Sequence, residues 1–129
     1  MRKQRDVNKI VIEKMLGYCD DIKNYMNQVN ATYEVYLTNK MFRYSCDMCV
    51  LQIGELTRRF SDDFKAQHSE ISWNKIKGMR NIFVHEYEEV DFETAWNALT
   101  QRIPELKAQL EKILAAEGEE KAISNLKKT

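Results

Sequence analysis

Apolar side chains recur at three- and four-residue intervals along most of this chain, and that spacing is the strongest constraint on its fold. Side chains three and four apart share one face of an α-helix, so the pattern predicts amphipathic helices. The 129 residues include one proline and four glycines, so few positions interrupt a helix. The first stripe, in a helix over about residues 6–29, consists of Val7, Ile10, Val11, Met15, Cys19, Ile22, Met26 and Val29.

Residues 30–32 interrupt the first helix and can cap the segment that follows, which begins with a short apolar patch over residues 33–37. The same spacing then predicts further helices. We expect them over about residues 39–60, 73–86 and 92–118, and we expect Ser61, Ser72 and Asp91 to cap helices. Pro104 either kinks the last helix or begins a new one. The predicted fold is all-α, an antiparallel up-and-down helical bundle, with a helical domain over 1–118, ended by Gly118, and a C-terminal tail over 119–129.

The second predicted helix contains three further features. Its stripe includes Met41 or Phe42, and Gly54 lies well inside it. A glycine there costs about 1 kcal/mol relative to alanine, so we expect a close contact with another helix at Gly54. Cys46 and Cys49 form a C-x2-C pair, but a zinc site needs four ligands and the sequence contains no second pair. We therefore favour plain packing of these cysteines over metal or redox chemistry.

Composition narrows the function classes. The formal net charge is zero, so overall charge does not indicate a nucleic-acid binder. No run of about 18 apolar residues is present, and the basic N-terminus leads into a polar helix, not an apolar signal core. Three cysteines suit a reducing compartment better than a disulfide framework. These observations predict a cytoplasmic protein without a membrane span.

The most informative motif is the run Arg80-Asn81-Ile82-Phe83-Val84-His85-Glu86-Tyr87. Histidine exchanges protons near neutral pH, and a neighbouring arginine can hold a phosphate. On a straight α-helix Arg80 and His85 are about 140° apart, so either the helix ends near His85 or two copies meet across a two-fold axis. A plainer alternative is a histidine favoured by the helix dipole and a surface contact between Arg80 and Tyr87.

This run resembles the HepT-like toxin family of the HEPN superfamily, and the resemblance extends over about residues 5–115. The other segments that carry it are Gln52-Ile53-Gly54-Glu55, Ile71-Ser72-Trp73, Val90-Asp91, Trp96 and Pro104-Glu105-Leu106. The resemblance implies a symmetric homodimer with the motifs at its interface. It also implies a toxin that is a metal-independent RNA endonuclease without a cofactor, paired with a minimal nucleotidyltransferase as antitoxin.

The resemblance also assigns roles. His85 would be the general acid or base, Arg80 would bind the phosphate and Asn81 would position them. Tyr87 matches the tyrosine that the antitoxin adenylylates in this family. Glu55 matches the acid of the I-G-E segment, and we interpret it as a structural partner of Arg80.

Charge along the chain suggests where RNA would bind. Residues 81–99 contain five acids and no Lys or Arg, whereas residues 58–80 contain six bases and three acids. We therefore expect RNA on the side of Lys75, Lys77 and Arg80. The acidic stretch either faces a basic antitoxin surface or is simply solvated.

Two other functions remain open from the sequence. The protein could be a non-catalytic binding partner of a nucleotidyltransferase, in which Arg80 and His85 serve phosphate binding or the dimer contact. It could also be a structural helical adaptor, in which changes to the motif alter stability alone.

Overall fold

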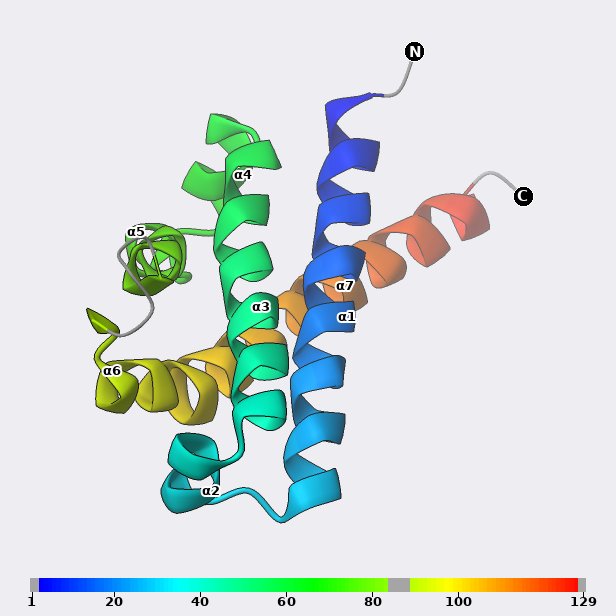
Figure 1. The fold of residues 1–129 in the computed structure, drawn as a ribbon. Coiled ribbons are helices and arrows are strands. Elements are labelled where there is room, and N and C mark those ends of the chain that lie inside the picture. Colours follow the sequence, from blue (N-terminus) through cyan, green and yellow to red (C-terminus); the bar gives the residue numbers. More distant parts are fainter. Residues whose placement is uncertain (1–2, 84–88, 128–129) are drawn as a thin grey trace.

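The computed structural model describes residues 3–83 and 89–127, and every regular element in these ranges is helical, as predicted (Figure 1). None of the described helices is long and apolar enough to span a membrane. Short 3₁₀ or π turns adjoin several α-helices. The elements are α1 (Gln4–Val29), α2 (Tyr33–Thr38), α3 (Lys40–Leu56), η1 (Thr57–Arg59), α4 (Asp62–Gln67), α5 (Trp73–Gly78), η2 (Met79–Phe83), α6 (Phe92–Asn97), η4 (Ala98–Arg102) and α7 (Ile103–Lys127).

The long helices α1 and α3 lie side by side and run in opposite directions, while α7 crosses behind them obliquely (Figure 1). The up-and-down arrangement therefore applies to the α1–α3 pair and not to α7. The predicted apolar stripes form the core between these helices. Its fully buried side chains include Val11, Ile12, Met15, Tyr36, Cys46, Val50, Ile53, Leu99, Leu106 and Leu110.

Three of the predicted cap residues accept hydrogen bonds from first-turn backbone N–H groups. The distances are 3.1 Å at Ser61, 3.1 Å at Thr32, and 3.1 and 3.2 Å at Asp91. The prediction for Ser72 is wrong in detail, because it occupies the N-cap position of α5 without a side-chain hydrogen bond. These caps explain where α2, α4 and α6 begin.

The helix predicted over residues 73–86 is different in the structure. It is α-helical only to Gly78 and continues as the 3₁₀ helix η2 to Phe83, beyond which residues 84–88 lie outside the described part. Glycine is a poor helix former, and Gly78 marks the change. A 3₁₀ helix has three residues per turn, so the angles expected from an α-helix do not apply to η2.

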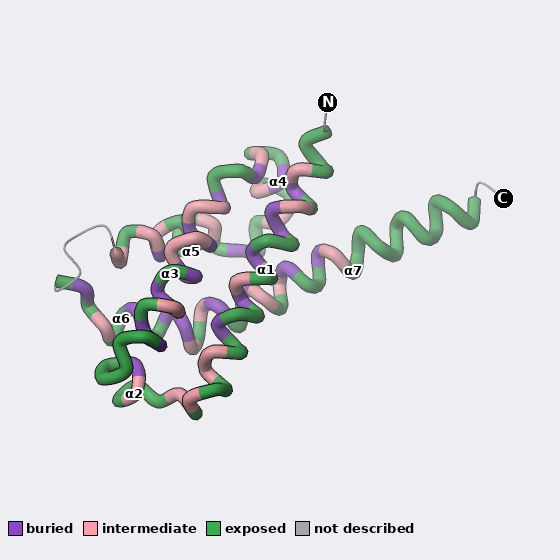
Figure 2. The backbone as a smooth tube through the Cα atoms, turned by 45° about the vertical axis from the view of Figure 1, so that its right-hand side comes forward, coloured by how far each residue is buried: buried purple, intermediate pink, exposed green. Residues whose placement is uncertain are grey.

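The C-terminal helix corrects a second boundary. Gly118 does not end it, because α7 continues through Gly118 to Lys127. One glycine costs only about 1 kcal/mol, and strong helix formers surround this one. Residues 115–127 are all exposed (Figure 2). The division into a domain over 1–118 and a tail over 119–129 stays a prediction.

Pro104 lies in the first turn of α7, but it does not begin a separate helix, because the helical path runs without interruption from α6 through η4 into α7. It is the second residue of α7, directly after the π-helical turn η4. Proline has no N–H to donate to the carbonyl of Thr100 four residues earlier, and its ring crowds that carbonyl. The wider π turn accommodates this defect without breaking the helical path.

Gly54 brings α3 into close contact with α5 and η2, as its position within the predicted helix suggested. A Cβ atom on Gly54 would lie 3.0 Å from the backbone nitrogen of Arg80, 3.2 Å from the Cβ of Arg80 and 3.3 Å from the carbonyl oxygen of Ile76. Two of these atoms belong to the backbone, so they cannot move aside as a flexible side chain would. Glycine is therefore favoured over a residue with a Cβ atom where α3 crosses this turn.

We predict that Gly54→Ala lowers the free energy of unfolding by about 1–3 kcal/mol, because the new methyl group overpacks the contact. Gly17→Ala is a matched control, since Gly17 is also inside a helix but a Cβ atom added there would meet no other atom within 4 Å. That control should be neutral or stabilising by up to about 1 kcal/mol. Urea unfolding curves measure both. Equal stability of the two variants would contradict the close contact.

Candidate active site

The candidate site is centred on an ion pair between η2 and α3. Arg80 Nε pairs with Oε1 of Glu55, which is the partnership expected from the sequence. Glu55 Oε2 also lies 3.6 Å from Nη2 of Arg58, one helical turn further along the chain. Both oxygens of this carboxylate therefore face an arginine.

The Glu55 carboxylate orients Arg80 without covering it. The Arg80 side chain is 43% exposed and that of Glu55 is 30% exposed, so the pair lies at the surface. A guanidinium group has five N–H donors in a planar fork, more than one carboxylate can accept. Arg80 therefore keeps donors for an anionic ligand while its direction is fixed from α3.

The remaining residues of the motif are only partly described. Asn81 is exposed on η2, and Ile82 and Phe83 pack partly against the core. His85 and Tyr87 lie outside the described residues. Their predicted roles, and the predicted meeting of Arg80 with His85, stay predictions.

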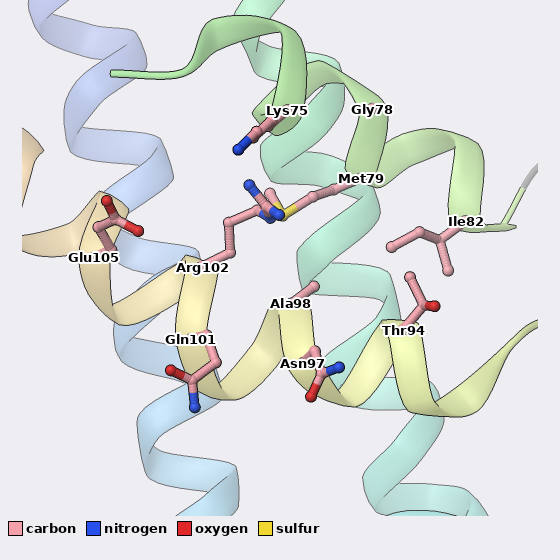
Figure 3. A pocket seen from close by; sticks show the side chains of 10 residues that line it. All are labelled: Lys75, Gly78, Met79, Ile82, Thr94, Asn97, Ala98, Gln101, Arg102 and Glu105. Carbon is pink, nitrogen blue, oxygen red and sulfur yellow. The ribbon is translucent and has the colours of Figure 1, made fainter. Parts of the chain in front are cut away.

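The basic residues that the sequence grouped together are divided between two surfaces. Lys75 and Lys77 are both exposed on α5. Lys75 lines a groove of about 800 Å³ between α5–η2 and α6–η4–α7 (Figure 3), and neither Lys77 nor Arg80 contributes to that lining. Arg80 instead pairs with α3.

A buried polar cluster next to α6 was not predicted. The hydroxyl of Tyr36 donates to Asp47 at 2.5 Å, and Arg43 donates to the carbonyl oxygens of Tyr36 and Leu37 at 3.2 and 2.6 Å. The guanidinium carbon of Arg43 lies 4.5 Å from the centre of the Phe92 ring. This cluster fixes α2 and α6 against α3. The sequence did contain an indication of this cluster, because Arg43 and Asp47 are four residues apart and lie beside the apolar stripe of their helix.

Cys46 and Cys49 are buried in the core, which confirms the packing interpretation. Burial raises the pKa of Cys46 to about 12 and that of Cys49 to about 11. The reactive thiolate form is therefore scarce at neutral pH. No cluster of three or more His, Cys, Asp or Glu side chains suited to a metal ion occurs in residues 3–83 and 89–127.

Two other features did not emerge from the sequence. Arg58 is a second partner of Glu55, which the three-residue spacing on a helix could have indicated. An exposed apolar stripe also follows the outer face of α3, and we call Met41, Tyr44 and Met48 the α3 stripe. The sequence left open whether Met41 or Phe42 belongs to the core. Phe42 does, since it is 5% exposed, whereas Met41 is 81% exposed.

Sequence comparisons identify relatives of this chain. The family model described as "Ribonuclease HepT-like" matches residues 15–113. "Putative RNase MJ1216" of Methanocaldococcus jannaschii is 33% identical over 111 residues, which cover 86% of this chain and 89% of the relative. "Probable ribonuclease HepT" of Thermococcus cleftensis is 32% identical over 81 residues, which cover 63% of this chain and 74% of the relative. No solved structure matches the chain significantly. The chain belongs to the HepT-like ribonuclease family.

Proposed function

We propose that this protein is the toxin of a toxin–antitoxin module and cuts RNA without a metal ion, with Arg80 and His85 as its catalytic residues. The observation that carries the proposal is the half-exposed Arg80, which Glu55 orients and which precedes His85 by five residues in the sequence. Family membership supports RNA as the substrate.

In the proposed reaction, the 2′-hydroxyl of RNA attacks the adjacent phosphorus. The new O2′–P bond forms while the P–O5′ bond breaks, which leaves a 2′,3′-cyclic phosphate and a free 5′-hydroxyl. His85 removes the proton from the 2′-hydroxyl or delivers one to the leaving 5′-oxygen, and its counterpart in a second copy could supply the other transfer. Arg80 stabilises the charge that develops on the phosphate oxygens, and Asn81 positions these groups.

The α3 stripe supports a homodimer as the active form. Met41 and Met48 are 81% and 55% exposed, although methionine is usually buried. Seven-residue spacing places Met41, Met48 and Glu55 on one face of α3. A two-fold contact over the α3 stripe would therefore continue towards Glu55 and Arg80, and would bring two Arg80 side chains to one cleft.

We further propose that Tyr87 is the site at which a nucleotidyltransferase antitoxin attaches adenylyl groups. Tyr87 lies two residues after His85 in the sequence. An anionic nucleotide at that position would repel the phosphates of RNA and occupy space that the substrate needs.

We predict that the purified protein cleaves single-stranded RNA in the presence of EDTA. His85→Ala and Arg80→Ala should each lower kcat/KM by about 10²–10⁴-fold, because they remove proton transfer and charge stabilisation. Arg5→Ala, at a side chain 82% exposed at the start of α1, is the matched control and should leave the rate unchanged. Intact RNA with the unaltered protein, under conditions in which the protein is still toxic to cells, would refute the proposal.

A second prediction concerns the homodimer. Met48→Glu should yield monomers and abolish cleavage, because it places two carboxylates in an apolar two-fold contact. Ile123→Glu tests an apolar side chain with nearly equal exposure, 53% against 55%, on the projecting part of α7. Light scattering coupled to size-exclusion chromatography distinguishes the variants. Retention of the dimer by Met48→Glu would exclude this face of α3 as the interface.

A third prediction concerns the antitoxin. Co-expression with a nucleotidyltransferase encoded beside the gene should raise the intact mass of the protein by whole multiples of an adenylyl group. The added mass should map to Tyr87, disappear in Tyr87→Phe and accompany loss of cleavage. If the mass is unchanged although the antitoxin fully neutralises the toxin, covalent modification is wrong and the antitoxin acts by steric binding.

A further inference from the structure

The groove between α5–η2 and α6–η4–α7 has two different ends (Figure 3). At one end, Lys75 and Arg102 reach towards one another from opposite walls, with Glu105 nearby. At the other end lie Ile82 and Thr94. These two are the lining residues nearest in sequence to His85 on either side of it.

The charges at the first end suit a bound anion. Neither Lys75 nor Arg102 forms an ion pair with any carboxylate of the described residues, whereas Arg80, Arg58 and Lys107 all do. Two cations that converge without an intervening anion repel one another. A phosphate placed between them would remove this repulsion and accept charge-assisted hydrogen bonds from both.

The floor of the groove suits the rest of a nucleotide. Met79 and Ala98 are 2% and 4% exposed, and Ile82 is half-buried at the end that it shares with Thr94. An apolar floor below a cationic end matches the ribose and base of a nucleotide with its phosphate at the rim. The lining includes no aromatic ring among the described residues, so phosphate contacts and not base stacking would dominate the affinity.

Arg102 enters this groove from the π turn η4. Arg102 is the last residue of η4 and lies two residues before Pro104. The wider turn changes the rotation of the helix between Ala98 and Pro104, so the side-chain direction cannot be extrapolated from the 3.6-residue repeat of α6. Such π turns occur frequently at functional sites.

We propose that this groove is the binding track for the RNA strand beside the cut, and that Lys75 and Arg102 together hold one phosphate of that strand. The inference rests on the proposed ribonuclease function and adds a substrate contact to it. The strand occupies the groove from the end formed by Ile82 and Thr94 to the two cations at the other end.

The test measures binding separately from cleavage. In a His85→Ala background, fluorescence anisotropy of labelled single-stranded RNA is recorded at several salt concentrations. Adding Lys75→Ala with Arg102→Ala should raise Kd by at least about tenfold and reduce the magnitude of the salt slope by about 0.7, as expected for one lost phosphate contact on single-stranded RNA. The charge-conserving double variant Lys75→Arg with Arg102→Lys should keep the Kd and the salt slope of the His85→Ala background. That result would show that the weaker binding of the alanine variant comes from lost charge and not from a changed fold.

The matched control is Lys9→Ala with Lys121→Ala. These two lysines line a groove of similar size, about 780 Å³, between α1 and α7, and their loss should change neither Kd nor salt slope. An unchanged Kd in the Lys75/Arg102 alanine pair, or an equal rise in the control pair, would overturn the inference. Displacement of the RNA by AMP at concentrations near the Kd for RNA would also overturn it, because the groove would then be a mononucleotide site.

Failure of the groove and failure of the proposed function give different results. If the unaltered protein cleaves RNA while the alanine pair binds normally, only the groove assignment is wrong. If the unaltered protein binds RNA through Lys75 and Arg102 without cutting it, the ribonuclease proposal is wrong and the groove stands. If it binds no RNA at all, both are wrong.

Discussion

The contact between Gly54 and the backbone of Arg80 is the constraint on which the site depends. It allows α3 to approach η2 so closely that the next residue, Glu55, reaches the Arg80 guanidinium. The two adjacent residues have different roles. Gly54 has no side chain and so permits the close approach, and Glu55 supplies the charge that orients Arg80. A solvent-exposed ion pair alone contributes little stability, so the packing around Gly54 must supply the rigidity.

Features of the structure that depend on regular helical spacing were predicted well from the sequence. The stripe of α1, the burial of Cys46 in the core, and the pairing of Glu55 with Arg80 all depend on which side chains share a face or a family pattern. Helix ends were predicted less well. Gly78 coincides with a change of helix type, whereas Gly118 interrupts nothing, because neighbouring residues and tertiary packing decide what one glycine does.

The surface of the site was the hardest part to predict. Lys75 and Arg80 are five residues apart, yet one lines the groove and the other pairs with α3. Arg102 reaches the same groove from a π turn, whose phase no periodic pattern specifies. Local departures from α-helical geometry therefore determine which cations can act together, and a helical wheel drawn from the sequence cannot reveal them.

The end of α7 has a consequence for how the protein melts. Residues 115–127 are helical, but all are exposed, so no buried apolar surface holds them in that form. Their helicity depends on intrinsic propensity and on continuation from the anchored part of α7. Far-ultraviolet circular dichroism should consequently lose intensity gradually on warming, well before the cooperative transition of the core, and would not describe a two-state equilibrium.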